Sequence, residues 1–270
     1  MGGGGGLPHA AVTAMAALPR RLLALPPTLA GIATVGLAIA LVEILVRMAV
    51  INPYIVPLPS EVFLAMGRIV VEEDVLHRFL VTGGGALTAA ILVTVIGIPA
   101  GTMLFRLRAL RHATEVWIAS MAAAPIGLMY PLFLVILGRN MWTLVAIGTL
   151  TGLPPVILKT LEGLSAVPPV LTDVGRSFRL APYQLFTKIM LPAALPSIFA
   201  GVRIGLIFST ISVVGMEFLI NIGGLGPLIS ELAERYDLPG TYAAIGFVVL
   251  VCVFFFLVIE KAEQWLQPQS

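Results

Sequence analysis

Long runs of apolar residues, each close to the length that crosses a lipid bilayer, follow one another along most of this 270-residue chain. A spanning helix needs about 20 predominantly apolar residues. Charged residues make up only 11% of the chain, whereas a soluble domain has about 25%. A transmembrane β-barrel would show segments of about ten residues with alternating polarity, but these runs are continuous. The sequence therefore predicts an all-α membrane protein.

Six transmembrane helices are predicted from these runs. They cover residues 28–51, 83–105, 116–137, 141–164, 197–220 and 241–259. Six spans put both ends of the chain on one side of the membrane. If that side is the inside, eleven of the sixteen lysines and arginines lie on the inner side, as the positive-inside rule requires. We therefore expect a multi-pass protein of the bacterial cytoplasmic (inner) membrane with both termini in the cytoplasm.

The chain ends differ in composition from the membrane domain between them. Residues 1–27 contain five consecutive glycines and four prolines, which favours a flexible cytoplasmic segment. The apolar run that follows is long enough to span, and no convincing cleavage site of small residues accompanies it, so we predict an uncleaved first span. The transmembrane domain is predicted over residues 28–262, and residues 263–270 form a cytoplasmic tail.

Glu43 and Arg47 lie four residues apart in the first predicted span, with the acid first, which is the favourable order for a helical ion pair. A structural pair near the end of the span is one interpretation. A polar position on a transport pathway is the alternative.

Residues for catalysis or metal binding are not grouped in this sequence. Cys252 is the one cysteine and lies within an apolar run, and the three histidines lie on separate loops. We therefore expect no catalytic site, no cofactor and no metal site. The sequence also lacks the GxxxxGK[ST] loop that binds nucleotide phosphates, and no nucleic-acid partner is expected.

The most polar interior segment is the loop predicted over residues 166–196, between the fourth and fifth spans. Val170, Leu171, Val174 and Phe178 fall on one face of a short helix that begins near Pro168 and Pro169, and Pro182 permits a second short helix. A helix of about ten residues is too short to cross the membrane or to be stable alone. Its apolar face must pack against the bilayer interface, the protein's own helices or a groove on a soluble partner.

Several motifs resemble those of permease subunits of binding-protein-dependent ABC importers. Asp173-Val174-Gly175 stands at the acid-Ala-Ala start of their cytoplasmic signature loop, and Leu191-Pro192 with Leu195-Pro196 at its end. Gly201-Val202-Arg203 is similar to the Gly-Leu-Arg of that family, and Glu217 followed by Gly224-Leu225-Gly226 is similar to its acid and Gly-Leu-Gly. The opening Val56-Pro57-Leu58-Pro59-Ser60 resembles the nitrate/sulfonate/taurine branch. The resemblance covers about residues 55–262.

This resemblance implies the type I ABC importer permease fold, with a cytoplasmic coupling helix between the fourth and fifth spans. It implies a non-catalytic subunit that moves a small, nitrate-, sulfonate- or taurine-like solute by alternating access. The implied partners are two ABC ATPase subunits, a periplasmic or lipid-anchored solute-binding protein, a second permease copy in a homodimer, and membrane lipid.

The resemblance also assigns roles to individual residues. The expected ATPase-coupling residues are Leu171, Asp173, Val174, Gly175, Arg176, Phe178, Arg179 and Leu180. The loop is expected to end at Leu191, Pro192 and Pro196, with Pro196 starting the fifth span. Arg203 and Glu217 are the polar candidates for a translocation path lined by the third, fourth and fifth spans, and a structural pair or interfacial anchor is the alternative.

Arg179 departs from the family pattern, because the family usually has glycine at this position. Glycine allows a tight bend at the end of the coupling helix. We expect either that the bend moves toward Ala181-Pro182 or that the partner is unusual.

Two other classes of protein fit a polytopic chain of this kind: a self-contained secondary transporter or intramembrane enzyme, and a non-transporting scaffold. Secondary transporters often contain inverted repeats, and no internal repeat is evident. An intramembrane enzyme needs clustered catalytic side chains within its spans. Co-purification of an ATPase subunit would discriminate the importer from these alternatives.

Overall fold

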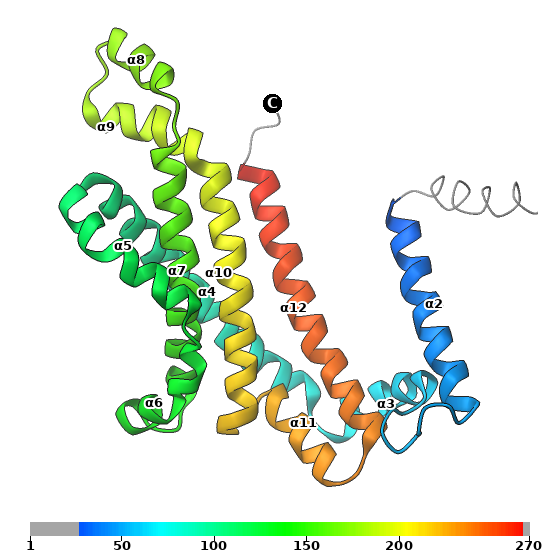
Figure 1. Cartoon of the computed structure of the whole chain (residues 1–270). Coiled ribbons are helices and arrows are strands. Elements are labelled where there is room, and N and C mark those ends of the chain that lie inside the picture. Colours follow the sequence, from blue (N-terminus) through cyan, green and yellow to red (C-terminus); the bar gives the residue numbers. More distant parts are fainter. Residues whose placement is uncertain (1–26, 267–270) are drawn as a thin grey trace, which may run out of the picture. The chain divides into compact units, whose positions relative to one another are not determined.

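The computed structural model describes residues 27–266, and every regular element in that range is a helix, as the sequence predicts. The predicted flexible segment lies, apart from Pro27, outside the described residues. The chain divides into two compact units, Met1–Leu64 and Ala65–Ser270, which we describe separately. The elements (Figure 1) are α2 Pro27–Arg47, α3 Pro59–Glu72, α4 Val75–Arg106, α5 Arg108–Ala123, η1 Ile126–Met129, α6 Tyr130–Leu137, α7 Met141–Ser165, α8 Pro169–Ser177, α9 Pro182–Leu185, η2 Phe186–Met190, α10 Leu191–Ile220, α11 Leu225–Glu234 and α12 Leu238–Leu266.

The first unit contains α2 and the start of α3. The predicted ion pair within α2 is confirmed, with Arg47 Nε 2.8 Å from a carboxylate oxygen of Glu43. The same carboxylate accepts hydrogen bonds from the backbone N–H and the hydroxyl of Ser60, at 3.1 and 2.9 Å. Glu43 therefore joins the end of α2 to the start of α3.

The second unit is built around α4, α7 and α10, which pack against one another through small residues. A Cβ atom at Gly152 would lie 2.6 Å from the carbonyl oxygen of Gly205, and a Cβ at Gly205 would lie 2.6 Å from that of Gly152. On α4, a Cβ at Gly101 would lie 2.7 Å from the carbonyl oxygen of Ile157. Spanning helices associate without a hydrophobic driving force between them, so such close backbone approach provides their packing contacts.

Five described helices are long and apolar enough to cross a membrane, and a sixth span is obtained if one bent pair is counted. The bent pair is α5 with the segment Ile126–Leu137, which meet at 87°. Pro125 explains the break, because the residue before a proline avoids the helical region, and Ala124 is extended at φ −74° and ψ 135°. The region predicted as the third span is therefore two helical pieces.

Other helix ends differ from the predicted spans. α4 begins at Val75, eight residues before the predicted second span. α12 continues to Leu266, so the first residues of the predicted tail are helical.

Three ion pairs tie the corner between α3 and α4 to the corner between α11 and α12. Arg68 pairs with Asp237 at 2.5 Å, and Arg235 pairs with Glu73 at 2.6 Å. Arg78 makes two bonds to Glu231, at 2.8 and 3.3 Å. The hydrogen bond from Arg68 to Asp237 also raises the pKa of the Arg68 guanidinium. These contacts hold together one end of the second unit, and α8 lies at the other end.

Candidate functional site

Within the second unit, α8 and α9 lie at one end, beside the C-terminal end of α7 and the start of α10 (Figure 1). α8 begins where the sequence predicts a helix start. Pro168 is extended at ψ 133°, and Pro169 occupies the first turn, where its missing N–H leaves no unpaired donor. An exposed ion pair between Asp173 and Arg176, at 3.0 Å, spans one turn of the helix.

Four apolar side chains on α8 and at its end are exposed and share one face. Val170, Val174 and Phe178 are 70%, 48% and 76% exposed, and Leu171 is also exposed. We call these four residues the α8 face. A contiguous apolar surface beside polar residues is typical of an interaction site.

Gly175 is the one buried residue of α8, and it holds the helix against the segment that follows. A Cβ atom there would lie 2.5 Å from Leu185 Cδ1 and 2.6 Å from Ile189 Cδ1. α8 therefore rests on α9 and η2 with its glycine side, and the α8 face is left uncovered by the described residues.

The turn after α8 is a Schellman motif centred on Arg179. Arg179 has φ +55°, its N–H donates to the carbonyl of Arg176, and the N–H of Leu180 donates to the carbonyl of Gly175. The expected shift of the bend toward Ala181-Pro182 is therefore wrong, because the chain bends at Arg179. A side chain in this left-handed conformation costs about 1–2 kcal/mol, a cost that glycine at this position would avoid.

The expected end of the loop lies inside a helix. α9, η2 and α10 form one apolar helical stretch from Pro182 to Ile220, so Pro196 lies inside a helix and does not start one. η2 is a π-helix turn, in which Leu191 N–H donates to the carbonyl of Phe186 five residues back. Pro192 follows directly. Because proline has no N–H, the helix can return there from π to α hydrogen bonding without leaving an unpaired backbone donor.

Arg203 and Glu217 both lie on α10 but are not brought together, since fourteen residues of helix separate them by about 21 Å. The guanidinium carbon of Arg203 lies 5.7 Å from the centre of the Phe256 ring. Glu217 is fully buried and accepts hydrogen bonds from the Thr82 hydroxyl at 2.7 Å and from the Gly226 N–H at 3.3 Å. These contacts give Glu217 a structural role, and a role in the translocation path stays a prediction for both residues.

Sequence reasoning missed Thr82, whose hydroxyl also accepts the N–H of Leu225 at 2.9 Å. It also missed Arg106, whose guanidinium carbon lies 4.5 Å from the centre of the Phe186 ring. Neither residue carries a local signal, because each partner is distant in the sequence.

Comparison with known proteins identifies related membrane components. Residues 93–266 match the family described as "Binding-protein-dependent transport system inner membrane component". The chain is 30% identical over 175 residues to the glycine betaine/proline betaine transport system permease protein ProW of Escherichia coli, a match that covers 64% of this chain and 49% of ProW. The chain thus spans about half the length of that relative.

A second relative is matched over more of its length. The formylaminopyrimidine transport permease protein ThiX of Halalkalibacterium halodurans is 25% identical over 227 residues, which cover 84% of this chain and 90% of ThiX. The riboflavin transport system permease protein RibX of Chloroflexus aurantiacus is 26% identical over 160 residues, 59% of this chain and 60% of RibX.

Solved structures share the fold at low sequence identity. A chain of the MetNI methionine ABC transporter, crystallised in inward-facing conformations, aligns with a TM-score of 0.57 and 21% identity, covering 72% of this chain and 94% of that chain. An amino acid ABC transporter aligns with a TM-score of 0.53 and 15% identity, covering 74% and 97% of the two chains.

Proposed function

This chain belongs to the family of binding-protein-dependent transport system inner membrane components, and we propose that it is the permease subunit of an ATP-driven importer. In this role the chain is not itself an enzyme. It alternates between inward- and outward-facing states while partner subunits hydrolyse ATP.

The α8 face carries the proposal. Val170, Leu171, Val174 and Phe178 are exposed on a helix of nine residues, which is too short to be stable alone. Its packing through Gly175 fixes the orientation of this face, and the Schellman turn at Arg179 fixes its end. We propose that the face docks in a cleft of an ATPase subunit, so that closure of the ATPase dimer moves α8 and, through η2, α10.

The membrane orientation supports the same assignment. The positive-inside count favours a cytoplasmic α8 end, where ATPase subunits would have access to ATP. The proposed assembly contains two copies of this permease, two ATPase subunits and an external solute-binding protein.

The transported solute is proposed to be small, and two chemical classes are candidates. The opening motif at residues 56–60 favours an anionic solute such as nitrate, a sulfonate or taurine. The relatives named above are described as permeases for betaines, a formylaminopyrimidine and riboflavin, which favours a nitrogen-containing organic solute. Uptake assays with one labelled compound of each class would separate the two.

Co-purification and uptake measured on the same variants test the proposed docking. Val174→Glu and Phe178→Glu each put a carboxylate on the α8 face, and we expect loss of the ATPase subunit from the purified complex together with loss of uptake. Thr172→Glu adds the same charge on the side of α8 away from this face, at a residue outside the expected coupling set, and should retain both. Full uptake with either glutamate variant, or no ATPase subunit with the unmodified chain, would contradict the proposal.

A further inference from the structure

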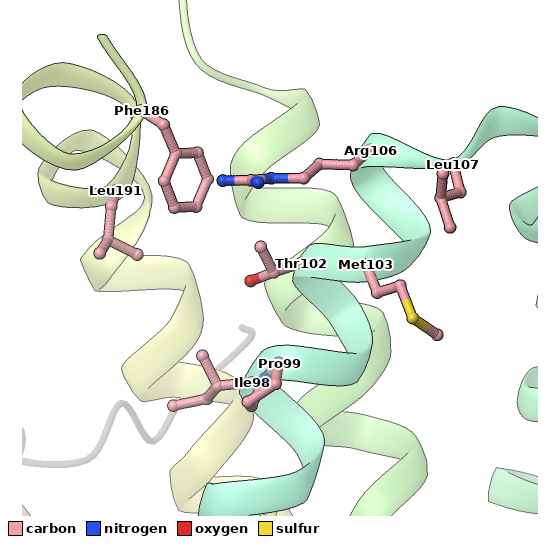
Figure 2. Close-up of a pocket in the computed structure, with 8 residues that line it drawn as sticks. All are labelled: Ile98, Pro99, Thr102, Met103, Arg106, Leu107, Phe186 and Leu191. Atoms are coloured by element: carbon pink, nitrogen blue, oxygen red, sulfur yellow. The ribbon is translucent and has the colours of Figure 1, made fainter. Parts of the chain in front are cut away.

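A groove lies beside the C-terminal end of α4, between that helix and the η2–α10 junction. It has a volume of about 570 Å³, and the side chains that line it are Ile98, Pro99, Thr102, Met103, Arg106, Leu107, Phe186 and Leu191. Figure 2 shows Arg106 reaching from α4 toward the Phe186 ring, with Ile98 and Leu191 further along the same two helices. Arg106 is thus the one charged side chain in an otherwise mostly apolar lining.

The Arg106 guanidinium is held in place but keeps its hydrogen-bonding capacity. It is exposed, and its guanidinium carbon lies 4.5 Å from the centre of the Phe186 ring. This contact is to the aromatic ring, and the positive charge and N–H donors of Arg106 suit the oxygens of a phosphate. The Phe186 contact therefore positions a cation that an oxyanion can bind.

Nearby carboxylates do not neutralise this cation. Glu115 on α5, Glu162 on α7 and Asp173 on α8 each pair with a cation on their own helix. Among the side chains that the structure describes, which exclude residue 259 and those from 262 on, no carboxylate lies within ion-pair distance of Arg106 or of Lys188 on η2. The groove thus has a net positive mouth that an anion would complement.

The groove is apolar along the membrane span and charged at its end, as a phospholipid has apolar acyl chains and a charged headgroup. α4 is a candidate span of 32 residues that ends at Arg106, so Ile98 and Thr102 lie within the span and Arg106 lies where the helix leaves the bilayer. Basic pockets between spanning helices at the membrane interface bind anionic headgroups.

We propose that this groove is a binding site for an anionic phospholipid. The headgroup phosphate binds Arg106, and an acyl chain lies along Ile98, Met103 and Leu191. The site requires only that α4 spans the membrane, so it does not depend on docking of an ATPase subunit by α8.

Native mass spectrometry of the purified transporter, released from nanodiscs of equal phosphatidylglycerol and phosphatidylcholine, tests the site. We expect preferential retention of phosphatidylglycerol. Arg106→Gln should lower this retention about fivefold, and Arg106→Lys should preserve most of it. Arg108→Gln is the matched control, since it removes the same charge two positions along, outside the groove, and should leave retention unchanged.

Three results would overturn the proposal. Equal retention of both lipids would show that the groove does not select charge. The same loss with Arg108→Gln as with Arg106→Gln would show only a general surface attraction. Displacement of the lipid effect by millimolar inorganic phosphate would show a site for free anions. Thermal unfolding of each variant identifies any loss of retention that reflects misfolding. If Arg106→Gln is misfolded, loss of phosphatidylglycerol retention in a folded Arg106→Lys variant would contradict the proposal.

Discussion

The hydroxyl of Thr82 lies 2.7 Å from the carboxylate of Glu217, although the two residues are 135 positions apart in the sequence. The same hydroxyl accepts the N–H of Leu225, and the N–H of Gly226 donates to Glu217. A Cβ atom at Gly224 would collide with this carboxylate. One buried acid and one hydroxyl therefore join α4 and α10 to the start of α11, and glycine leaves room for them.

Replacing Thr82 by valine should destabilise the protein by about 1–3 kcal/mol, because valine leaves the N–H of Leu225 and one bond of Glu217 unpaired in a buried site. Thermal unfolding in detergent measures the effect. Thr82→Ser keeps the hydroxyl and should stay closer to the unmodified protein. A valine variant as stable as the serine variant would contradict this role.

Gly152→Ala should destabilise the bundle by about 1–3 kcal/mol, because the added Cβ meets the backbone carbonyl of Gly205, which cannot move aside as a side chain can. Gly215→Ala is the control on α10, since nothing lies within 4 Å of a Cβ at that position. The two unfolding temperatures should differ clearly. Equal temperatures would mean that α7 and α10 are further apart than described.

Arg179→Gly should slow hydrogen exchange at the amides of residue 179 and Leu180, because glycine adopts φ +55° without the steric cost that a side chain adds. Arg179→Val should speed exchange at the same amides, since a β-branched residue is strained there. Exchange followed by mass spectrometry gives the comparison.

Uptake by the same glycine variant separates two roles of Arg179. If the residue only closes the turn, Arg179→Gly should transport as well as the unmodified chain. Loss of uptake despite slower exchange would show that the partner needs the arginine side chain.

Glu231→Gln should lower stability by about 1 kcal/mol, because it removes the charge from a partly buried pair with two bonds to Arg78. The loss should shrink as salt is added, since salt screens the pair. Glu72→Gln is the control: its 3.4 Å contact with Arg68 is more exposed and should contribute nothing measurable. Equal effects of the two substitutions would contradict a specific role for the Arg78 pair.

Much of the α8 region could be predicted from local pattern. Pro168 and Pro169 marked the helix start, and the spacing of Val170, Leu171, Val174 and Phe178 defined one apolar face, because a helix of known period needs only its own sequence to align side chains. The turn at Arg179 could not be predicted. A left-handed arginine is disfavoured locally, and it persists here within a turn closed by two backbone hydrogen bonds and packed through Gly175 against Leu185 and Ile189.

The sequence by itself determined that the chain is helical, that it carries about six membrane-length apolar segments, and that a polar loop with an amphipathic helix separates the fourth from the fifth. These properties follow from length, composition and period, which are local. Only the tertiary structure decided that the third segment bends at Pro125, that Glu217 meets Thr82, and that Arg106 contacts the Phe186 ring. Those contacts join residues distant along the chain, and their energies depend on which helices pack together and at what distance.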